Sequence, residues 1–303
     1  MTTQESRDHA WLPRASCDSE CLRAGGADAS RRVIVALRAA RRLSVTLLLA
    51  PVLPVLVLVL PGWSKSRQIY CRLLLWCLGV RITLSGGPIR NLPGVLVVSD
   101  HMSWLDIVTI GAVLPANRWR RVPLSFVARA DVAGNLMVRM MANIVRAIPI
   151  ERNSLRQLPD VVATVAARLY AGHTVVAFPE GTTWCGLPGS IGARHAHPGS
   201  GPFYPAMFQA AVDTGRPVQP LRLRYFHKDG RVSTVPAYIG DDTLLQSIGR
   251  LMVARHTVAR IYVESLELPG NDRRELARRC QAAIRVTPAS YPDHGQRPSV
   301  LAS

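Results

Sequence analysis

The sequence is poor in acidic residues and has almost no lysine. Its 303 residues contain 20 Asp and Glu against 37 Lys and Arg, which gives a formal net charge of +17. Lys65 and Lys228 are the only lysines, so arginine supplies nearly all of the positive charge. So basic a chain indicates a polyanionic partner, either nucleic acid or an anionic lipid surface. The charge alone does not choose between them.

Aromatic residues are also scarce, at 6% of the chain. Few of them interleave with the arginines and no nucleic-acid-binding motif is present, so we do not expect nucleic acid as the partner. Hydrophobic residues make up 48% and charged residues 19%, which excludes a disordered tail protein, a collagen-like fibre and a coiled coil. The length suits one large α/β domain or a catalytic domain with an anchoring appendage.

Cysteine is sparse, and the six cysteines follow no secretory signal at the N-terminus. We therefore expect a reducing compartment and no disulfide framework. Cys17 and Cys21 form a C-x-x-x-C pattern, but no second Cys or His pair lies near them in the sequence, as a four-ligand zinc site requires. His195 and His197 lack a second pair in the same way, within a loop rich in Gly and Pro. The sequence thus predicts no metal site and no redox cofactor.

The N-terminal part of the chain divides into a leader and an anchor. Residues 1–30 are polar and have no periodicity, so we expect a flexible leader. Arginines then alternate with apolar residues at helical spacing, and residues 43–61 form an uncharged stretch of 19 residues. As a helix this stretch would be about 28 Å long, close to a hydrocarbon core of about 30 Å. Pro51 and Pro54 interrupt it, so a spanning helix and a hairpin both stay open. We expect residues 31–85, including a second helix at 67–80, to anchor the chain to a membrane.

Residues 86–286 alternate between short apolar runs and helical patterns, which predicts one α/β domain. A mainly parallel central sheet with helices on both faces, and functional loops at the carboxyl ends of its strands, follows from this order. Residues 287–303 are expected to be a flexible tail. The predicted strands are 95–98, 124–128, 144–150, 174–178, 218–225 and 258–268, and the predicted helices are 104–114, 132–141, 155–170, 204–212 and 273–285.

The first candidate site follows a predicted strand, where His101 is followed by Asp106 in a strand-to-helix loop. A carboxylate on one ring nitrogen fixes the tautomer of a histidine and leaves the other nitrogen able to take a proton from a hydroxyl. No G-x-S-x-G motif is present and Cys185 has no local nucleophile signature, so the attacking hydroxyl is expected to belong to a substrate. A simple helix-capping arrangement is the alternative.

Two further candidates also follow strands. In AFPEGTTW, Pro179 and Gly181 flank Glu180 in a tight turn that would present its carboxylate together with nearby hydroxyls and amides to polyol or phosphate oxygens. Arg152 follows the strand that ends at Ile150, where its guanidinium could bind a phosphate or pair with a neighbouring acidic residue.

Together, the H-x-x-x-x-D pattern, an arginine after a strand and F-P-E-G-T resemble the glycerolipid acyltransferase family, and within it the bacterial 1-acylglycerol-3-phosphate acyltransferases. The resemblance runs from about Leu92 to Tyr225. It implies an enzyme at the cytoplasmic face of the cell membrane that moves a fatty acyl chain from acyl-CoA or acyl-carrier protein to the free hydroxyl of 1-acylglycerol 3-phosphate, making phosphatidic acid.

The resemblance also implies roles for single residues. His101 is the general base and Asp106 orients it. The residues implied in substrate binding are Arg129, Arg152, Glu180, Gly181 and Thr182. An acyltransferase acting on another lysolipid, such as lyso-ornithine lipid, shares these motifs and stays open. A non-catalytic membrane lipid-binding protein also stays open, although it has no need of His101 and Asp106.

Overall fold

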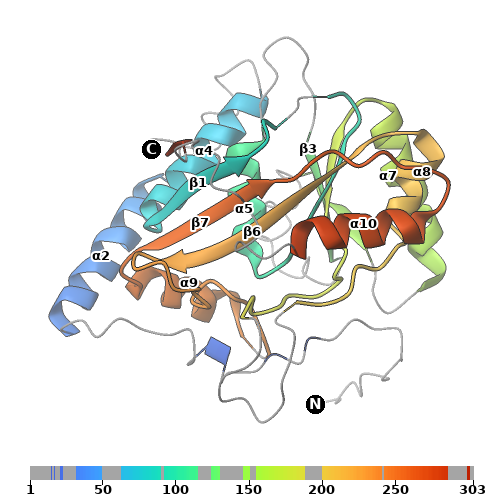
Figure 1. Ribbon diagram of the computed structural model, residues 1–303. Coiled ribbons are helices and arrows are strands. Elements are labelled where there is room, and N and C mark those ends of the chain that lie inside the picture. Colours follow the sequence, from blue (N-terminus) through green and yellow to red (C-terminus); the bar gives the residue numbers. More distant parts are fainter. Residues whose placement is uncertain are drawn as a thin grey trace, which may run out of the picture.

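The computed structural model describes residues 15, 17, 21–22, 32–49, 63–89, 92–114, 124–129, 146–150, 155–187, 200–240, 242–285 and 299–300. Within these residues, eight strands form one mixed sheet with helices packed against it (Figure 1). The predicted α/β fold class is thereby confirmed.

Most of the sheet is parallel. The strands are β1 (Val80–Gly86), β2 (Leu96–Ser99), β3 (Leu124–Arg129), β4 (Ile148–Ile150), β5 (Thr174–Ala177), β6 (Val218–His227), β7 (Thr257–Val263) and β8 (Ser299–Val300). Their order in the sheet is β4-β3-β5-β2-β6-β7-β1-β8. From β4 to β6 all neighbours are parallel, whereas β7 is antiparallel to β6, and β1 is parallel to β7. The carboxyl ends of five strands therefore meet at one edge.

Helices cover both faces of the sheet, as expected. The helices are α2 (Arg32–Leu49), α4 (Trp63–Cys77), α5 (Trp104–Val113), η2 (Leu155–Gln157), α7 (Leu158–Tyr170), α8 (Phe208–Thr214), α9 (Leu244–Val253) and α10 (Arg273–Arg285). Buried residues of α4, α5 and α9 share one hydrophobic cluster, and those of α7, α8 and α10 share another. Strand residues alternate between the clusters, with Val97 in the first and Leu96 and Val98 in the second. This alternation is the period of two expected of a strand buried on both faces.

Three described elements were not predicted from sequence: β1, α9 and the short β8, which lies within residues 287–303, the expected flexible tail. The helix expected at 67–80 ends at Cys77, and β1 begins at Val80. Between them Gly79 has φ +73, and a Cβ there would overlap the guanidinium of Arg42. Glycine adopts this left-handed conformation at little cost, which lets the chain leave the helix and enter β1. Helix α9 was missed as well, and the helix predicted at 132–141 lies outside the described residues.

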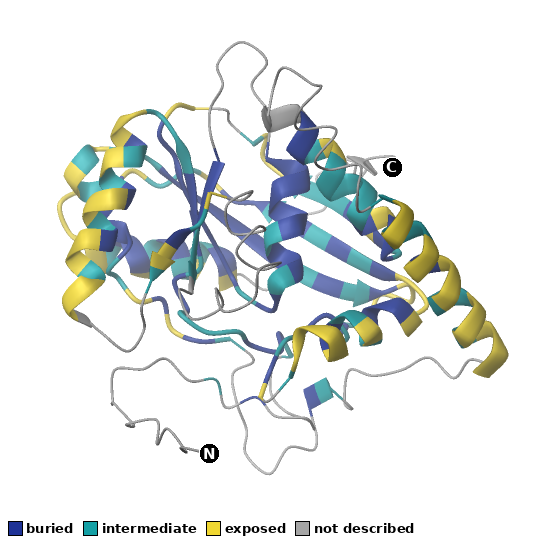
Figure 2. Ribbon diagram, turned by 180° about the vertical axis from the view of Figure 1, so that it is seen from behind, coloured by how far each residue is buried: buried dark blue, intermediate teal, exposed yellow. Residues whose placement is uncertain are grey.

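The N-terminal segment differs in part from the expected anchor. Helix α2 carries the basic amphipathic segment into the uncharged stretch and is described as far as Leu49, and residues 50–62 lie outside the description. No helix in the described part of the chain combines the length and the apolarity needed to cross a membrane. Val33, Leu37, Leu47 and Leu48 of α2 are exposed. Figure 2 draws much of α2, the helix at the lower right, in yellow.

Arg42 fastens α2 to the end of α9. Its guanidinium is buried and donates hydrogen bonds of 2.7 to 3.1 Å to the main-chain carbonyls of Leu251, Met252, Ala254 and Arg255. Carbonyls in the last turn of a helix have no partner within the helix, so the guanidinium satisfies the buried carbonyls of Leu251 and Met252 and also binds the two that follow the helix. Burial, with Arg38 and Arg41 nearby, lowers the pKa of Arg42 to about 10, which still leaves it charged at neutral pH.

We expect Arg42→Met to lower the free energy of unfolding by about 2 to 3 kcal/mol, because the apolar stem stays while the carbonyls of α9 lose a charged donor. Urea denaturation of the purified protein measures this change. Arg41→Met is the matched control, since Arg41 is exposed on the same helix, and its effect should stay within about 0.5 kcal/mol. Equal losses in the two variants would contradict the anchoring role.

Candidate active site

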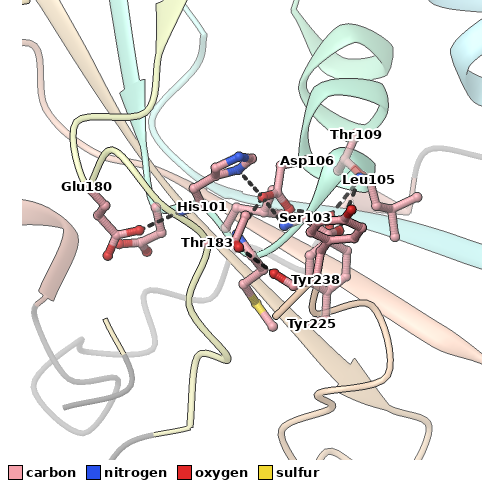
Figure 3. Close-up of polar contacts among 12 residues, drawn as sticks. His101, Ser103, Leu105, Asp106, Thr109, Glu180, Thr183, Tyr225 and Tyr238 are labelled. Atoms are coloured by element: carbon pink, nitrogen blue, oxygen red, sulfur yellow. Dashed lines mark hydrogen bonds and ion pairs between the residues drawn. The ribbon is translucent and has the colours of Figure 1, made fainter. Parts of the chain in front are cut away.

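The loops after β2 and β5 lie side by side at the carboxyl edge of the sheet. These two strands are parallel neighbours, so His101, after β2, comes close to Glu180, after β5. The main-chain N–H of His101 donates a hydrogen bond of 2.8 Å to Oε2 of Glu180 (Figure 3). Two motifs that are 79 residues apart in the sequence therefore belong to one site.

The first turn of α5 brings Asp106 to His101. Ser103 is the N-cap residue, and its hydroxyl accepts from the main-chain N–H of Leu105 at 3.1 Å. Asp106 completes a capping box by accepting from the main-chain N–H of Ser103 at 2.9 Å. Because His101 precedes the helix, its ring folds back, and Nδ1 lies 2.9 Å from Oδ2 of Asp106. The capping interpretation and the pairing interpretation are therefore both correct, since one carboxylate does both.

Every partner of Asp106 apart from the histidine ring is a hydrogen-bond donor. Oδ2 also accepts from the main-chain N–H of Met102 at 2.6 Å, and Oδ1 accepts from the hydroxyl of Tyr225 at 2.8 Å. The carboxylate is fully buried. Since it acts as the acceptor in these contacts, the hydrogen shared with His101 belongs on Nδ1. Nε2 then carries the lone pair, on a side chain that is 17% exposed.

Tyr225 reaches Asp106 from β6. Its hydroxyl also lies 3.3 Å from Oγ1 of Thr109 in α5. Complete burial and the charge of Asp106 raise the pKa of Tyr225 well above its ordinary value, so the hydroxyl keeps its proton and remains a donor. Asp106 is thus braced from the sheet and from its own helix.

His101 is held on three further sides. Its ring stacks on that of Phe178, with 4.1 Å between centroids and an interplanar angle of 17°. Its main-chain oxygen accepts from the N–H of Trp184 at 2.8 Å, and its own N–H is taken by Glu180. These contacts fix the orientation of the ring, and among the described residues only Nδ1, not Nε2, has a hydrogen-bond partner.

Glu180 lies differently from the expectation. The turn was predicted to present its carboxylate to a ligand, but the side chain is only 1% exposed. Oε2 accepts from His101, and Oε1 accepts from the main-chain N–H of Gly201 at 2.9 Å. Both carboxylate oxygens accept hydrogen bonds from main-chain N–H groups, so this carboxylate positions His101. The turn itself is as predicted, with φ +68 at Gly181 and Thr182 partly buried beside it.

A second polar cluster lies on the opposite face of the sheet from Tyr225. Adjacent strand residues point to opposite faces, so Arg224 faces away from Asp106. Its Nη1 lies 2.6 Å from Oδ2 of the buried Asp100. Burial raises the pKa of Asp100 and of Glu180, and the charge of Arg224 opposes both shifts. The guanidinium thus offsets the cost of two neighbouring buried carboxyl groups.

The structure describes the side chain of neither predicted arginine, Arg129 or Arg152. Arg129 ends β3 and pairs with Ile150 at the end of β4, so its backbone lies at the same edge as His101. Its side chain and the whole of Arg152 lie outside the described residues. Sequence reasoning missed Tyr225 and Arg224, because both lie in a strand whose local pattern signals only burial.

Comparisons with known proteins show what this chain is similar to. A family model described as Acyltransferase matches residues 81–224, which contain His101, Asp106 and Glu180. A 1-acyl-sn-glycerol-3-phosphate acyltransferase from Neisseria gonorrhoeae is 33% identical over 145 residues, covering 48% of this chain and 49% of that protein. A lyso-ornithine lipid O-acyltransferase from Pseudomonas aeruginosa is 31% identical over 193 residues, covering 63% of this chain and 67% of that protein. The chain thus spans about half the length of the Neisseria relative and two thirds of the Pseudomonas one.

A solved structure is also similar. The crystal structure of the 1-acyl-sn-glycerophosphate acyltransferase from Thermotoga maritima superposes with a TM-score of 0.55 at 16% identity. The match covers 84% of this chain and 94% of that one. At that identity the likeness establishes a shared fold.

We expect Glu180→Gln to destabilise the protein by about 1 to 3 kcal/mol, because the new amide turns a donor toward a main-chain N–H that then has no acceptor. Thermal unfolding monitored by circular dichroism measures the loss. Glu275→Gln on α10 is the control, since Glu275 is exposed and pairs only with the exposed Arg278 among the contacts described for it. A Glu180→Gln protein as stable as the control would show that the carboxylate does not hold the loop.

Proposed function

The chain belongs to the acyltransferase family, and we propose that it transfers a fatty acyl chain from an acyl thioester to the free hydroxyl of a lysolipid. One observation carries the proposal. His101 is fixed by the buried Asp106 with its second ring nitrogen available, whereas no nucleophile motif accompanies it. Such a pair activates a hydroxyl that a substrate brings.

The proposed reaction proceeds by direct attack. Nε2 of His101 takes the proton of the acceptor hydroxyl as its oxygen bonds to the thioester carbonyl carbon. The tetrahedral intermediate then collapses and expels the thiolate, which takes from Nε2 the proton that the acceptor hydroxyl gave up. Asp106 stabilises the imidazolium that exists between these steps. Every proton and electron pair comes from the two substrates and the imidazole, so this chemistry needs no cofactor.

As acceptor we propose 1-acylglycerol 3-phosphate, with acyl-CoA or acyl-carrier protein as the donor and phosphatidic acid as the product. The Neisseria relative is named for this acceptor. We assign the phosphate to Arg152 and Arg129 together with the turn at Gly181 and Thr182, because guanidinium groups pair bidentately with phosphate oxygens. Glu180 has the supporting role that its contacts with His101 and Gly201 indicate.

A lyso-ornithine lipid is the second candidate acceptor. The Pseudomonas relative, named for that lipid, aligns over 193 residues, against 145 for the Neisseria protein. A lyso-ornithine lipid carries an amine and a carboxylate where lysophosphatidic acid carries a phosphate. Purified protein incubated with radiolabelled acyl-CoA and each lysolipid separates the two, because chromatography identifies which product is labelled.

We propose that the enzyme works at the cytoplasmic face of the cell membrane. The exposed apolar residues of α2 and the surplus of arginine suit an anionic lipid surface. Sedimentation with anionic and with neutral vesicles tests this part separately from catalysis.

His101→Ala should lower acyl transfer by about 10² to 10⁴-fold, the range that general-base catalysis contributes. Product formation under saturating donor and acceptor measures the loss. His256→Ala is the control, because His256 is exposed at the start of β7, and this variant should keep full activity. An active His101→Ala enzyme with an unchanged circular dichroism spectrum would remove the mechanism. Wild-type protein that transfers no acyl chain to either lysolipid would instead favour a non-catalytic lipid-binding role.

Tyr225→Phe should lower kcat by about 3 to 10-fold with little change in KM, because the loss of one hydrogen bond, worth about 0.5 to 1.5 kcal/mol, loosens Asp106 and not the substrate. Steady-state kinetics separate the two constants. Tyr170→Phe is the matched control, since Tyr170 is 76% exposed on α7. A rise in KM alone would instead place Tyr225 in substrate binding.

A further inference from the structure

Three cysteines from distant parts of the chain converge at one buried point. The Sγ atoms of Cys17, Cys21 and Cys185 all lie within 4.8 Å of one another. Their exposures are 7%, 3% and 0%. Cys17 and Cys185 are 168 residues apart in the sequence, so it is the fold that brings half of the six cysteines together.

The backbone holds the three thiols in place. The main-chain N–H of Cys185 donates a hydrogen bond of 3.3 Å to Sγ of Cys17. The hydroxyl of the buried Thr234 donates 3.0 Å to the main-chain oxygen of Cys21. Gly186 follows Cys185 with φ +74, which lets the chain turn away directly after the thiol. These contacts hold Cys17 and Cys21 against the core, although both lie within residues 1–30, which were expected to form a flexible leader.

The spacing of the sulfurs suits one small ion. A tetrahedral zinc ion with bonds of about 2.3 Å places its sulfur ligands about 3.8 Å apart, so no pair would need to close by more than about 1 Å. Thiolates are soft ligands that select zinc over the hard cations magnesium and calcium. The sequence predicted no metal site because no further ligand lies near Cys17 and Cys21 along the chain. In the fold, Cys185 supplies a third ligand from a position 168 residues after Cys17.

We propose that Cys17, Cys21 and Cys185 bind one zinc ion through three thiolates, with a fourth position left for another ligand. Each thiol gives up its proton to solvent as its sulfur bonds to the metal. The proposed zinc site is independent of the proposed function, because it shares no side chain with the pair formed by His101 and Asp106.

Its place in the fold gives the site a structural role beside the catalytic loop. Cys185 directly follows Trp184, whose N–H donates to the main-chain oxygen of His101. In the same loop the hydroxyl of Thr183 donates to the main-chain oxygen of Tyr238 (Figure 3). A metal at the three sulfurs therefore ties the start of the chain to the loop that supports the histidine.

Metal analysis of the full chain, purified with a thiol reductant and without chelators, is the first test. Plasma mass spectrometry should find about one zinc per chain. Replacement by cobalt(II) should give the thiolate charge-transfer bands and strong visible absorption of a tetrahedral sulfur site. Cys185→Ser and Cys17→Ser should each lower zinc affinity by at least about 10-fold, as measured by competition with a chromophoric chelator. Cys71→Ser is the control and should keep its zinc, because Cys71 lies on α4, outside the cluster.

Four results would overturn the proposal. The wild-type protein could hold little or no zinc after incubation with zinc and removal of the excess, or it could hold iron with inorganic sulfide in place of zinc. Peptides prepared without reduction could contain a disulfide between two of these cysteines, or both serine variants could bind zinc with unchanged affinity. If the serine variants fail to fold, the zinc content and cobalt spectrum of the wild-type chain decide alone.

Discussion

The carboxylate of Asp106 is the contact on which the rest of the site depends. It closes the first turn of α5 through Ser103 and receives Nδ1 of His101 on the same oxygen. Formation of the helix and orientation of the base are therefore one event. Tyr225 on the other oxygen completes its hydrogen bonding, and a buried carboxylate with all of its partners is rigid because each donor holds it against the others.

The sheet brings further residues to the pair formed by His101 and Asp106. Parallel strands deliver the loops after β2 and β5 to one edge, so Glu180 can hold the backbone of His101 from a second motif. The alternation of β6 then assigns neighbouring residues to different tasks, with Tyr225 bracing Asp106 and Arg224 neutralising Asp100 on the other face. Within the F-P-E-G turn, Glu180 acts on the histidine through the main-chain N–H of His101.

The sequence predicted the features that depend on neighbours along the chain. Alternating apolar runs indicated the α/β sheet, and the spacing of His101 and Asp106 indicated a pair at a strand end. Contacts between distant residues left no local signal. The inward turn of Glu180, the approach of Tyr225 and the meeting of Cys185 with Cys17 join residues 79, 119 and 168 positions apart. Helix α9 was missed although its pattern is amphipathic, with Leu251 and Met252 buried and the charged Arg250 partly exposed.

The four hydrogen bonds from Arg42 to main-chain carbonyls fix the orientation of α2 relative to α9. Helix α9 in turn contacts α5, because Nε1 of Trp104 donates a hydrogen bond of 3.1 Å to the hydroxyl of Ser247. The exposed apolar residues of α2 and the helix that carries Asp106 therefore have a fixed relative orientation.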